Sequence, residues 1–337
     1  MEQALYSLNK SIPDNKKLRL LSRNKNNISL SPLTEQPEPG NINKMKGQIQ
    51  SVWPMTSLLD ILKEADMRIR FTECFKTQRS SERLNRDELQ KRLLLALYGL
   101  GTNTGLKRIS SGRHGVNYKE LLHVRKFYIY KTALREAIGK VANAIFKIRN
   151  PDIWGEGTTA CASDSKKFGS WDQNLMTEWH IRYGGRGVMI YWHVEKKSTC
   201  IYSQLKRCSS SEVASMIEGV LRHCTEMDID KQYVDTHGQS EVAFAFSYLL
   251  GFNLMPRLKN IAKQKLYIPD IGSANNLQNL TPILTRPINW ELIAQQYDQM
   301  IQYTTALKQG TADPEAILRR FTKGNITHPT YRALSEL

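Results

Sequence analysis

Apolar residues recur along the chain with two different spacings, which predict a helical part followed by a mixed part. Between residues 54 and 154 they are spaced three and four apart, as in the run from Leu134 to Ile145, which is typical of helices. Between residues 155 and 258, short runs of β-branched and aromatic residues alternate with helical stretches. We therefore predict an α/β fold whose sheet lies in the middle of the chain.

Three helices are predicted in the helical part. They cover residues 56–65, 88–100 and 118–149, and Gly101 follows the second as a C-cap. Residues 1–53 are polar and carry three prolines between Pro32 and Pro39, so we expect an extended, basic arm or linker there. Residues 259–337 are again helical, with amphipathic segments from Trp290 to Leu307 and from Pro314 to Phe321.

The pattern of residues 155–258 predicts, in order, a strand, a two-stranded hairpin, a helix, a strand, a helix and a last strand. The five strands are expected over residues 158–163, 188–194, 199–205, 232–234 and 252–255. The first helix is expected to start at a capping box of Ser209 and Glu212. The second is expected to run from Ser240 to Leu250 and to be closed by Gly251.

Two aspartates are the candidate metal-binding residues of this part. Asp164, in A-C-A-S-D-S-K-K-F-G, is expected to end the first strand, and Asp235, in Q-Y-V-D-T-H-G-Q-S, the fourth. Carboxylates at strand ends can bind a hard divalent cation, and paired cations promote displacement at phosphorus. Turn-forming aspartates occupy the same kind of position, and the pattern alone favours neither interpretation.

The charge of the chain favours a polyanionic partner. The 337 residues include 48 Lys and Arg against 32 Asp and Glu, a net charge of +16. Between Lys107 and Arg149 there are eleven basic residues and only two acidic ones. This excess favours a surface that binds the DNA backbone, the alternative being a solvated helix face.

Composition argues against several other classes of protein, namely membrane, secreted, disulfide-rich and zinc-binding proteins. No apolar run approaches the roughly 20 residues that span a bilayer, and the first residues lack the pattern of a signal peptide, so a cytoplasmic protein is expected. The five cysteines are irregularly spaced and form no C-x-x-C pair, which argues against a disulfide framework and a structural zinc site. We expect the adjacent His223 and Cys224 not to bind a metal.

Five long motifs follow one another in the middle of the chain: S-D-S-K-K-F-G, N-L-M-T-E-W-H, R-Y-G-G-R-G-V-M-I-Y-W-H-V, Y-V-D-T-H-G-Q-S and L-L-G-F-N-L-M-P-R-L-K. They resemble the catalytic region of transposases of the Tn-three family, the enzymes of replicative, cointegrate-forming transposons. Similar segments upstream and downstream extend the resemblance over nearly the whole chain. The resemblance is specific because the motifs are long and ordered.

The resemblance implies a ribonuclease-H-like core over residues 155–258, flanked by helical segments, with a D-D-E set of acids that binds Mg²⁺ or Mn²⁺. By position, Asp164 and Asp235 match the first two acids and would be catalytic residues and metal ligands. The family's third acid, a glutamate, follows a helical insertion, and residues 259–337 match the start of that insertion. We therefore expect an incomplete core without the third-acid helix, in an internal fragment truncated at both ends. Three glutamates near the end are not assigned the role: Glu291, Glu315 and Glu336.

The implied function is DNA transposition, by metal-dependent nicking of DNA strands and strand transfer. The alternatives are a non-catalytic, DNA-binding remnant of a transposase and a nuclease that shares the core. Transposon ends and target DNA would be the partners, and the family assembles as multimers on DNA. Basic residues and one histidine are the candidate DNA contacts: Lys166, Lys167, His237, Arg257, Lys259, Lys107, Arg108, Arg125 and Lys126. Trp171 and Trp192 are candidates for base stacking, although buried packing is the more frequent fate of tryptophan.

Overall fold

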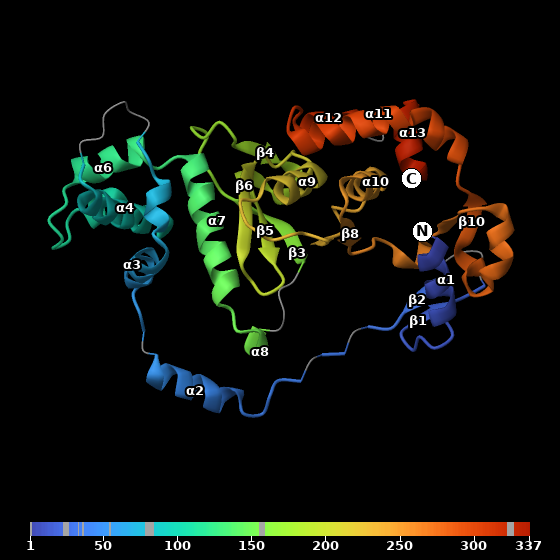
Figure 1. Ribbon diagram of the computed structural model, residues 1–337, viewed down its shortest axis with the longest axis horizontal. Coiled ribbons are helices and arrows are strands. Elements are labelled where there is room, and N and C mark those ends of the chain that lie inside the picture. Colours follow the sequence, from blue (N-terminus) through green and yellow to red (C-terminus); the bar gives the residue numbers. More distant parts are fainter. Residues whose placement is uncertain are drawn as a thin grey trace.

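The computed structural model describes residues 2–22, 27–32, 34–35, 37–53, 55–77, 84–154, 159–321 and 327–337. Within these ranges a mixed sheet forms the centre of the molecule, with a helical part on one side and further helices on the other (Figure 1). None of the helices in the described ranges is long and apolar enough to cross a membrane.

The central sheet has six strands among the described residues. They are β3 (Ala160–Phe168), β4 (Glu178–His180), β5 (Gly185–Glu195), β6 (Cys200–Lys206), β7 (Lys231–Val234) and β8 (Asn253–Pro256). The order is β6–β5–β3–β7–β8, and the short β4 pairs with the first residues of β5. Strand β3 is antiparallel to β5 and parallel to β7, which is parallel to β8. The predicted hairpin over residues 188–205 is confirmed as β5 and β6, whereas β4 was not predicted.

The two faces of the sheet differ in burial, because successive side chains of a strand point to opposite faces. Cys161, Ser163 and Tyr191 are buried on the face that packs with α9 (Glu212–Arg222) and α10 (Glu241–Leu250) into the main hydrophobic core. The opposite face carries the exposed residues Asp164 and Tyr233. The predicted caps of α10 are confirmed, since the Ser240 side chain accepts a hydrogen bond from the Ala243 amide and Gly251 is left-handed at φ 90°.

Helix α9 approaches the sheet at Gly219. A Cβ atom at this position would lie 1.8 Å from Nε2 of His193 on β5. Burial lowers the pKa of His193 to about 3, so this imidazole is neutral in the core, where its ring lies 5.3 Å from that of Tyr191. Only glycine therefore allows the helix to pack this close to the strand.

The substitution Gly219→Ala is expected to destabilise the fold by about 1–3 kcal/mol, because the added methyl group forces helix and strand apart. The measurement is the midpoint of urea unfolding. Gly47→Ala is the matched control, since it also replaces a helical glycine and nothing lies within 4 Å of its Cβ position. An unchanged midpoint for Gly219→Ala would contradict the close approach.

The helical part contains α3 (Leu58–Ile69), α4 (Arg86–Gly101), α5 (Leu106–Ile109), α6 (Tyr118–Phe127), α7 (Lys131–Ile148) and α8 (Pro151–Trp154). The single helix predicted over residues 118–149 is wrong, because the chain breaks between α6 and α7. Tyr128 is buried at the break, and Tyr130 is extended before α7. The run of aromatic and β-branched residues from Phe127 to Tyr130 has modest helix propensity, so packing of Tyr128 outweighs helix continuity.

The prediction of an extended arm over residues 1–53 is wrong at two helices and does not foresee a strand pair. The arm forms α1 (Glu2–Ser11), β1 (Leu18–Leu20), β2 (Ile28–Leu30) and α2 (Ile42–Val52). Helix α1 and the β1–β2 pair lie beside β10 (Leu284–Pro287) in Figure 1, and β10 pairs with β9 (Leu266–Ile268). Apolar residues of the arm pack there on Leu277, Leu280 and Ile283. The polar composition concealed these contacts because their partners lie more than 200 residues further along the chain.

The amphipathic helices predicted from Trp290 and from Pro314 are confirmed, whereas the strands β9 and β10 before them were not predicted. The last part of the chain contains α11 (Trp290–Gln309), α12 (Pro314–Arg320) and α13 (Pro329–Glu336), preceded by short 3-10 segments at Ile261–Lys263, Ile271–Asn276 and Gln278–Ile283. Elsewhere in the chain, 3-10 segments follow α3 at Phe71–Cys74 and β4 at Ile181–Tyr183. Glu336 of α13 makes a two-pronged ion pair with Arg286, which lowers the pKa of that carboxyl group. This ion pair joins α13 to the segment of β10.

Candidate active site

The sheet brings the two candidate aspartates onto neighbouring strands. Ser163 of β3 and Val234 of β7 are the last register pair of these parallel strands, and Asp164 and Asp235 are the residues that follow them. Asp235 ends β7, as predicted. Asp164 does not end its strand, because β3 continues to Phe168. Pairing with β5 from Asp164–Trp192 to Phe168–Val188 extends the strand through this polar segment, and such pairing is invisible in the local sequence.

Asp164 lies on the open face of the sheet. Its side chain is exposed, and its Oδ1 atom accepts a hydrogen bond of 2.7 Å from the backbone amide of Ser165. Lys166 and Phe168 follow on the same face, since side chains alternate along a strand. The carboxylate is therefore available to an external ligand.

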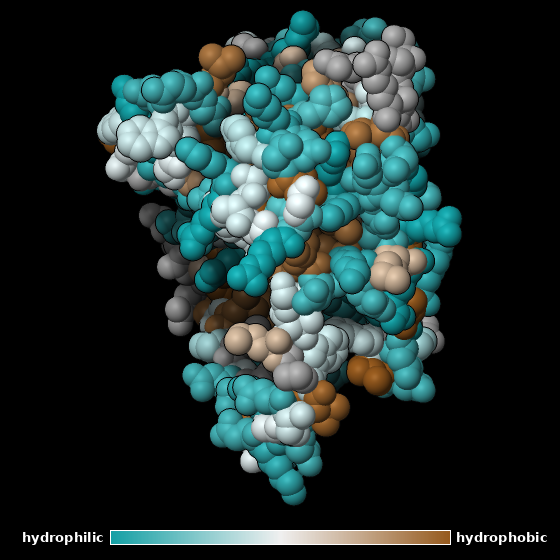
Figure 2. Space-filling model, turned by 90° about the vertical axis from the view of Figure 1, so that its left-hand side faces the viewer, coloured by the Kyte–Doolittle hydropathy of each residue, from teal (hydrophilic) through white to brown (hydrophobic). Residues whose placement is uncertain are grey.

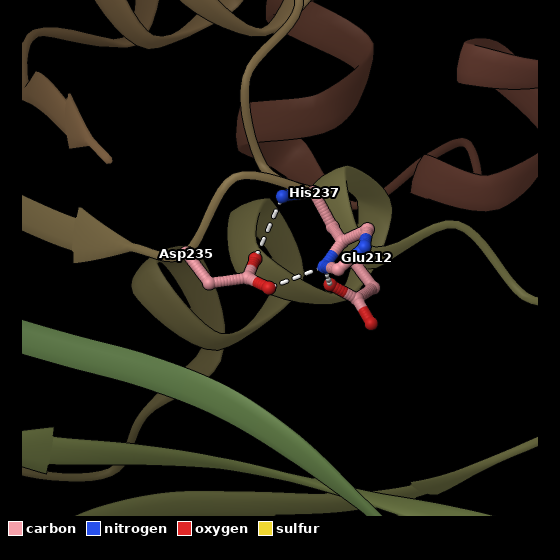
Figure 3. A group of neighbouring side chains, drawn as sticks. All are labelled: Glu212, Asp235 and His237. Carbon is pink, nitrogen blue, oxygen red and sulfur yellow. Dashed lines mark hydrogen bonds and ion pairs between the residues drawn. The ribbon is translucent and has the colours of Figure 1, made fainter. Parts of the chain in front are cut away.

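Asp235 is held by its neighbour His237 and, through it, by Arg182. Oδ1 of Asp235 accepts a hydrogen bond of 2.8 Å from the His237 amide, and Oδ2 contacts Nδ1 of the same residue (Figure 3). Nε2 of His237 lies 2.5 Å from Nη2 of Arg182. A guanidinium group can only donate, so Nε2 must accept, and the proton of the neutral imidazole is on Nδ1, which donates to Asp235.

Glu212 is a site residue that the sequence did not predict. It is the first residue of α9, whose N-cap is Ser211 and not Ser209 as predicted, because the Ser211 hydroxyl accepts from the Ala214 amide. The Glu212 side chain is thus not engaged in a capping box and extends toward Asp235 and His237 (Figure 3). Its Oε1 atom accepts a hydrogen bond of 2.9 Å from the Ser165 hydroxyl, and Oε2 lies 4.0 Å from Nδ1 of His237.

One atom each of Glu212, Asp235 and His237 lies within 4.8 Å of the others. Within the described ranges this is the one group of three or more such side chains close enough to hold a metal ion, and Asp164 is not in it. His223 and Cys224 belong to no such group in the described ranges. The signal for Glu212 in the sequence was an acid in the first turn of a helix, which many helices share.

Lys206, at the end of β6, is a second site residue that the sequence did not predict. It is 5% exposed, and no atom of the described residues forms a hydrogen bond with its Nζ atom. The ammonium lies 4.6 Å from the ring centroid of Tyr191, whose hydroxyl is 2.9 Å from the Ser163 hydroxyl. Burial lowers the pKa of Lys206, whereas the charges of Glu212, Glu315 and Asp235 raise it.

The candidate DNA contacts fall into two groups. Near the aspartates, Lys166 is exposed and Lys167 half-buried on β3, while Arg257 and Lys259 are exposed after β8. Arg257 is next to Asp235 in space, because its amide donates to the Val234 carbonyl. The candidates in the helical part are exposed on α5 and at the end of α6: Lys107, Arg108, Arg125 and Lys126. In Figure 1, α6 lies on the far side of α7 from the sheet, so the two groups are separated.

The basic surface is smaller than the count of charges indicated. Four basic residues of α7 and its C-cap form ion pairs with acidic residues of this chain: Arg135, Lys140, Lys147 and Arg149. The surface formed by α3, α4 and α6 is mainly hydrophilic, as Figure 2 shows. Trp171 is 85% exposed, contrary to the expected burial, whereas Trp192 is half-buried beside Phe168.

Comparison with known proteins identifies the family. The model of the family described as Tn3 transposase DDE domain matches residues 60–337. The transposase for transposon Tn1546 of Enterococcus faecium is 27% identical over 322 residues, 95% of this chain and 32% of the relative. The transposase for transposon Tn21 of Escherichia coli is 25% identical over 296 residues, 87% of this chain and 29% of the relative. The chain thus spans about a third of the length of these relatives. Because the family match extends over most of its length, the chain belongs to the Tn3 transposase DDE domain family.

Proposed function

We propose that this chain acts in DNA transposition, as part of a DDE transposase that nicks DNA strands and transfers them with the help of a divalent cation. The observation that carries the proposal is the placement of Asp164 and Asp235 on adjacent parallel strands, directly after the register pair of Ser163 and Val234. Together with the family match, this placement supports the two aspartates as the first two acids of the D-D-E set.

The core is proposed to be ribonuclease-H-like. Its support is the strand order β6–β5–β3–β7–β8, with three antiparallel strands followed by two parallel ones. The open face that carries Asp164 also exposes Tyr233 and Met255, at 44% and 41%. Apolar side chains on a sheet face are normally buried by another layer. A helix that bears the third acid is the covering element that the family resemblance implies.

The donor set fits a hard cation, which agrees with the general use of divalent metal ions by DDE transposases. Asp164 and Asp235 offer carboxylate oxygens, the ligands that Mg²⁺ and Mn²⁺ prefer. A bound cation supplies charge stabilisation to the attacking and leaving oxygens of phosphoryl transfer. His237 orients the Asp235 carboxylate, and Lys166 and Arg257 add positive charge near the position of the DNA backbone.

The test is incubation of the purified chain with duplex DNA that carries a transposon end, in Mg²⁺ or Mn²⁺. Single-strand nicks that leave a 3′-hydroxyl group support the proposed activity. The second candidate, a non-catalytic DNA-binding remnant, is favoured by the position of Asp164 outside the group of Glu212, Asp235 and His237. Binding of the DNA without nicks would support that candidate, and absence of both binding and nicks would overturn both.

The α5–α6 surface is expected to supply part of the DNA affinity. Replacing these four residues, Lys107, Arg108, Arg125 and Lys126, by alanine should weaken binding equally for all DNA sequences. The slope of log K against the logarithm of the salt concentration should become less steep by about 0.9 for each phosphate that is no longer neutralised. Binding isotherms at several salt concentrations measure this slope. Lys147→Ala is the control, because this lysine already pairs with Glu226. An unchanged slope in the fourfold variant would place the DNA elsewhere.

A further inference from the structure

We propose that Glu212 binds a divalent cation together with Asp235, and that His237 is a positioning residue and not a ligand. This inference rests on the proposed function, because it places a cation at Asp235. It adds a third carboxylate, distinct from Asp164 and Asp235, that contacts Ser165 on β3 and lies beside Asp235. The carboxylate comes from the first turn of α9.

The position of Glu212 is fixed from two sides. Ser165, the neighbour of Asp164, donates to its Oε1 atom at 2.9 Å, and its Oε2 atom lies 4.0 Å from the imidazole that holds Asp235. The side chain is 16% exposed, so it is ordered by packing rather than spread over solvent rotamers. The ligand atoms of the group lie within 4.8 Å of one another. Two oxygens on opposite sides of an octahedral Mg²⁺ are about 4 Å apart, so a small rotation of Glu212 brings it within binding distance.

His237 is unsuited to be a ligand in this arrangement. A metal needs the lone pair of an imidazole nitrogen, but Nδ1 carries the proton donated to Asp235 and the Nε2 lone pair accepts from Arg182. Asp235 retains further lone pairs on both oxygens, since each carboxylate oxygen can accept more than one hydrogen bond. The cation would therefore have oxygen ligands only from this group, which favours Mg²⁺ and Mn²⁺ over Zn²⁺.

Lys206 is an independent observation that points to a ligand in this place. Its ammonium is buried, its Nζ atom has no hydrogen-bond acceptor among the described residues, and Glu212 and Asp235 are among the charges that act on it. A buried charge without a hydrogen bond is costly, so an acceptor is expected when the site is filled. The oxygens of a DNA phosphate bound to the same cation are such acceptors, because an ammonium group donates strongly to anionic oxygens.

The test is the affinity of the full 337-residue chain for Mn²⁺, measured by the electron paramagnetic resonance signal of the free ion. We expect Glu212→Gln to weaken binding at least about tenfold, the scale seen when groups that support a metal are removed. Glu241→Gln is the matched control, because Glu241 is likewise the first residue after a capping serine, on α10, but lies outside the site. Its affinity should equal that of the unaltered chain. The loss in Glu212→Gln should persist at 0.5 M salt, where the field of a merely nearby charge is largely screened.

Other outcomes separate this inference from the proposed function. If Asp235→Asn weakens Mn²⁺ binding and Glu212→Gln does not, the inference fails while the proposed cation at Asp235 stands. If neither substitution changes the affinity, both fail. A ¹⁴N coupling of bound Mn²⁺ in spin-echo spectra that disappears in His237→Ala would make His237 a ligand and overturn its positioning role. Circular dichroism of each variant checks that the fold is retained.

Discussion

Replacing Asp235 by asparagine is expected to lower the rate of metal-dependent DNA nicking by about three orders of magnitude. The substitution keeps the shape of the side chain but removes the charge that binds the cation. Loss of metal-ion stabilisation is worth several kcal/mol, and each 1.36 kcal/mol corresponds to about tenfold in rate. The rate is measured on labelled transposon-end DNA with enzyme in excess, so that a single turnover is followed.

The comparison variants make this result specific. Asp164→Asn should lose a similar factor, and the double variant should lose little more, because groups that act as a unit are not additive. Asp298→Asn is the control, an exposed aspartate on α11 far along the chain from the site. If Asp235→Asn keeps more than a tenth of the rate, Asp235 is not a catalytic ligand.

The second large effect is expected at the junction between the helical part and the sheet. Arg149, after α7, forms a buried ion pair of 2.7 Å with Glu195 at the end of β5, with side chains 14% and 2% exposed. The same guanidinium also donates to the Lys197 carbonyl at 3.3 Å and to the Thr199 hydroxyl. Removing one partner of a buried pair costs about 3–5 kcal/mol, because the other charge stays buried without compensation. Glu195→Ala should therefore destabilise the fold by about that amount.

Urea unfolding of Glu195→Ala measures this cost. Glu226→Ala is a matched control, since it removes the partner of Lys147 on the same helix α7, where both side chains are about two-thirds exposed. An exposed pair contributes about 0–1 kcal/mol, so the control should unfold almost like the unaltered chain. If the two variants lose the same free energy of unfolding, Arg149 does not join α7 to the β5–β6 hairpin.

Local signals predicted the elements whose stability is decided within a few residues. The β5–β6 hairpin, the capped helix from Ser240 to Gly251 and the position of Asp235 after β7 follow the sequence pattern. Their determinants are turn residues, caps and side-chain periodicity, all readable within about ten residues. The family resemblance rests on motifs of the same local kind.

Errors arose where a distant partner decided the structure. Pairing with β5 extends β3 past Asp164, and burial of Tyr128 divides the predicted long helix. Packing on residues 277–283 orders an arm that its composition made look extended. In each case the stabilising interaction joins residues that no local window includes.

The sequence by itself determined the α/β class, the basic character, the transposase family and Asp235 at a strand end. Only the tertiary structure decided which side chains surround Asp235, namely His237 with Arg182 behind it and Glu212 from α9, with the buried Lys206 near enough for the charge of Asp235 to act on it. The physical reason is how far apart along the chain the interacting residues lie. Caps, turns and periodicity act between neighbours in the chain, whereas strand pairing and helix packing bring together residues 165, 206, 212 and 235 from four separate elements.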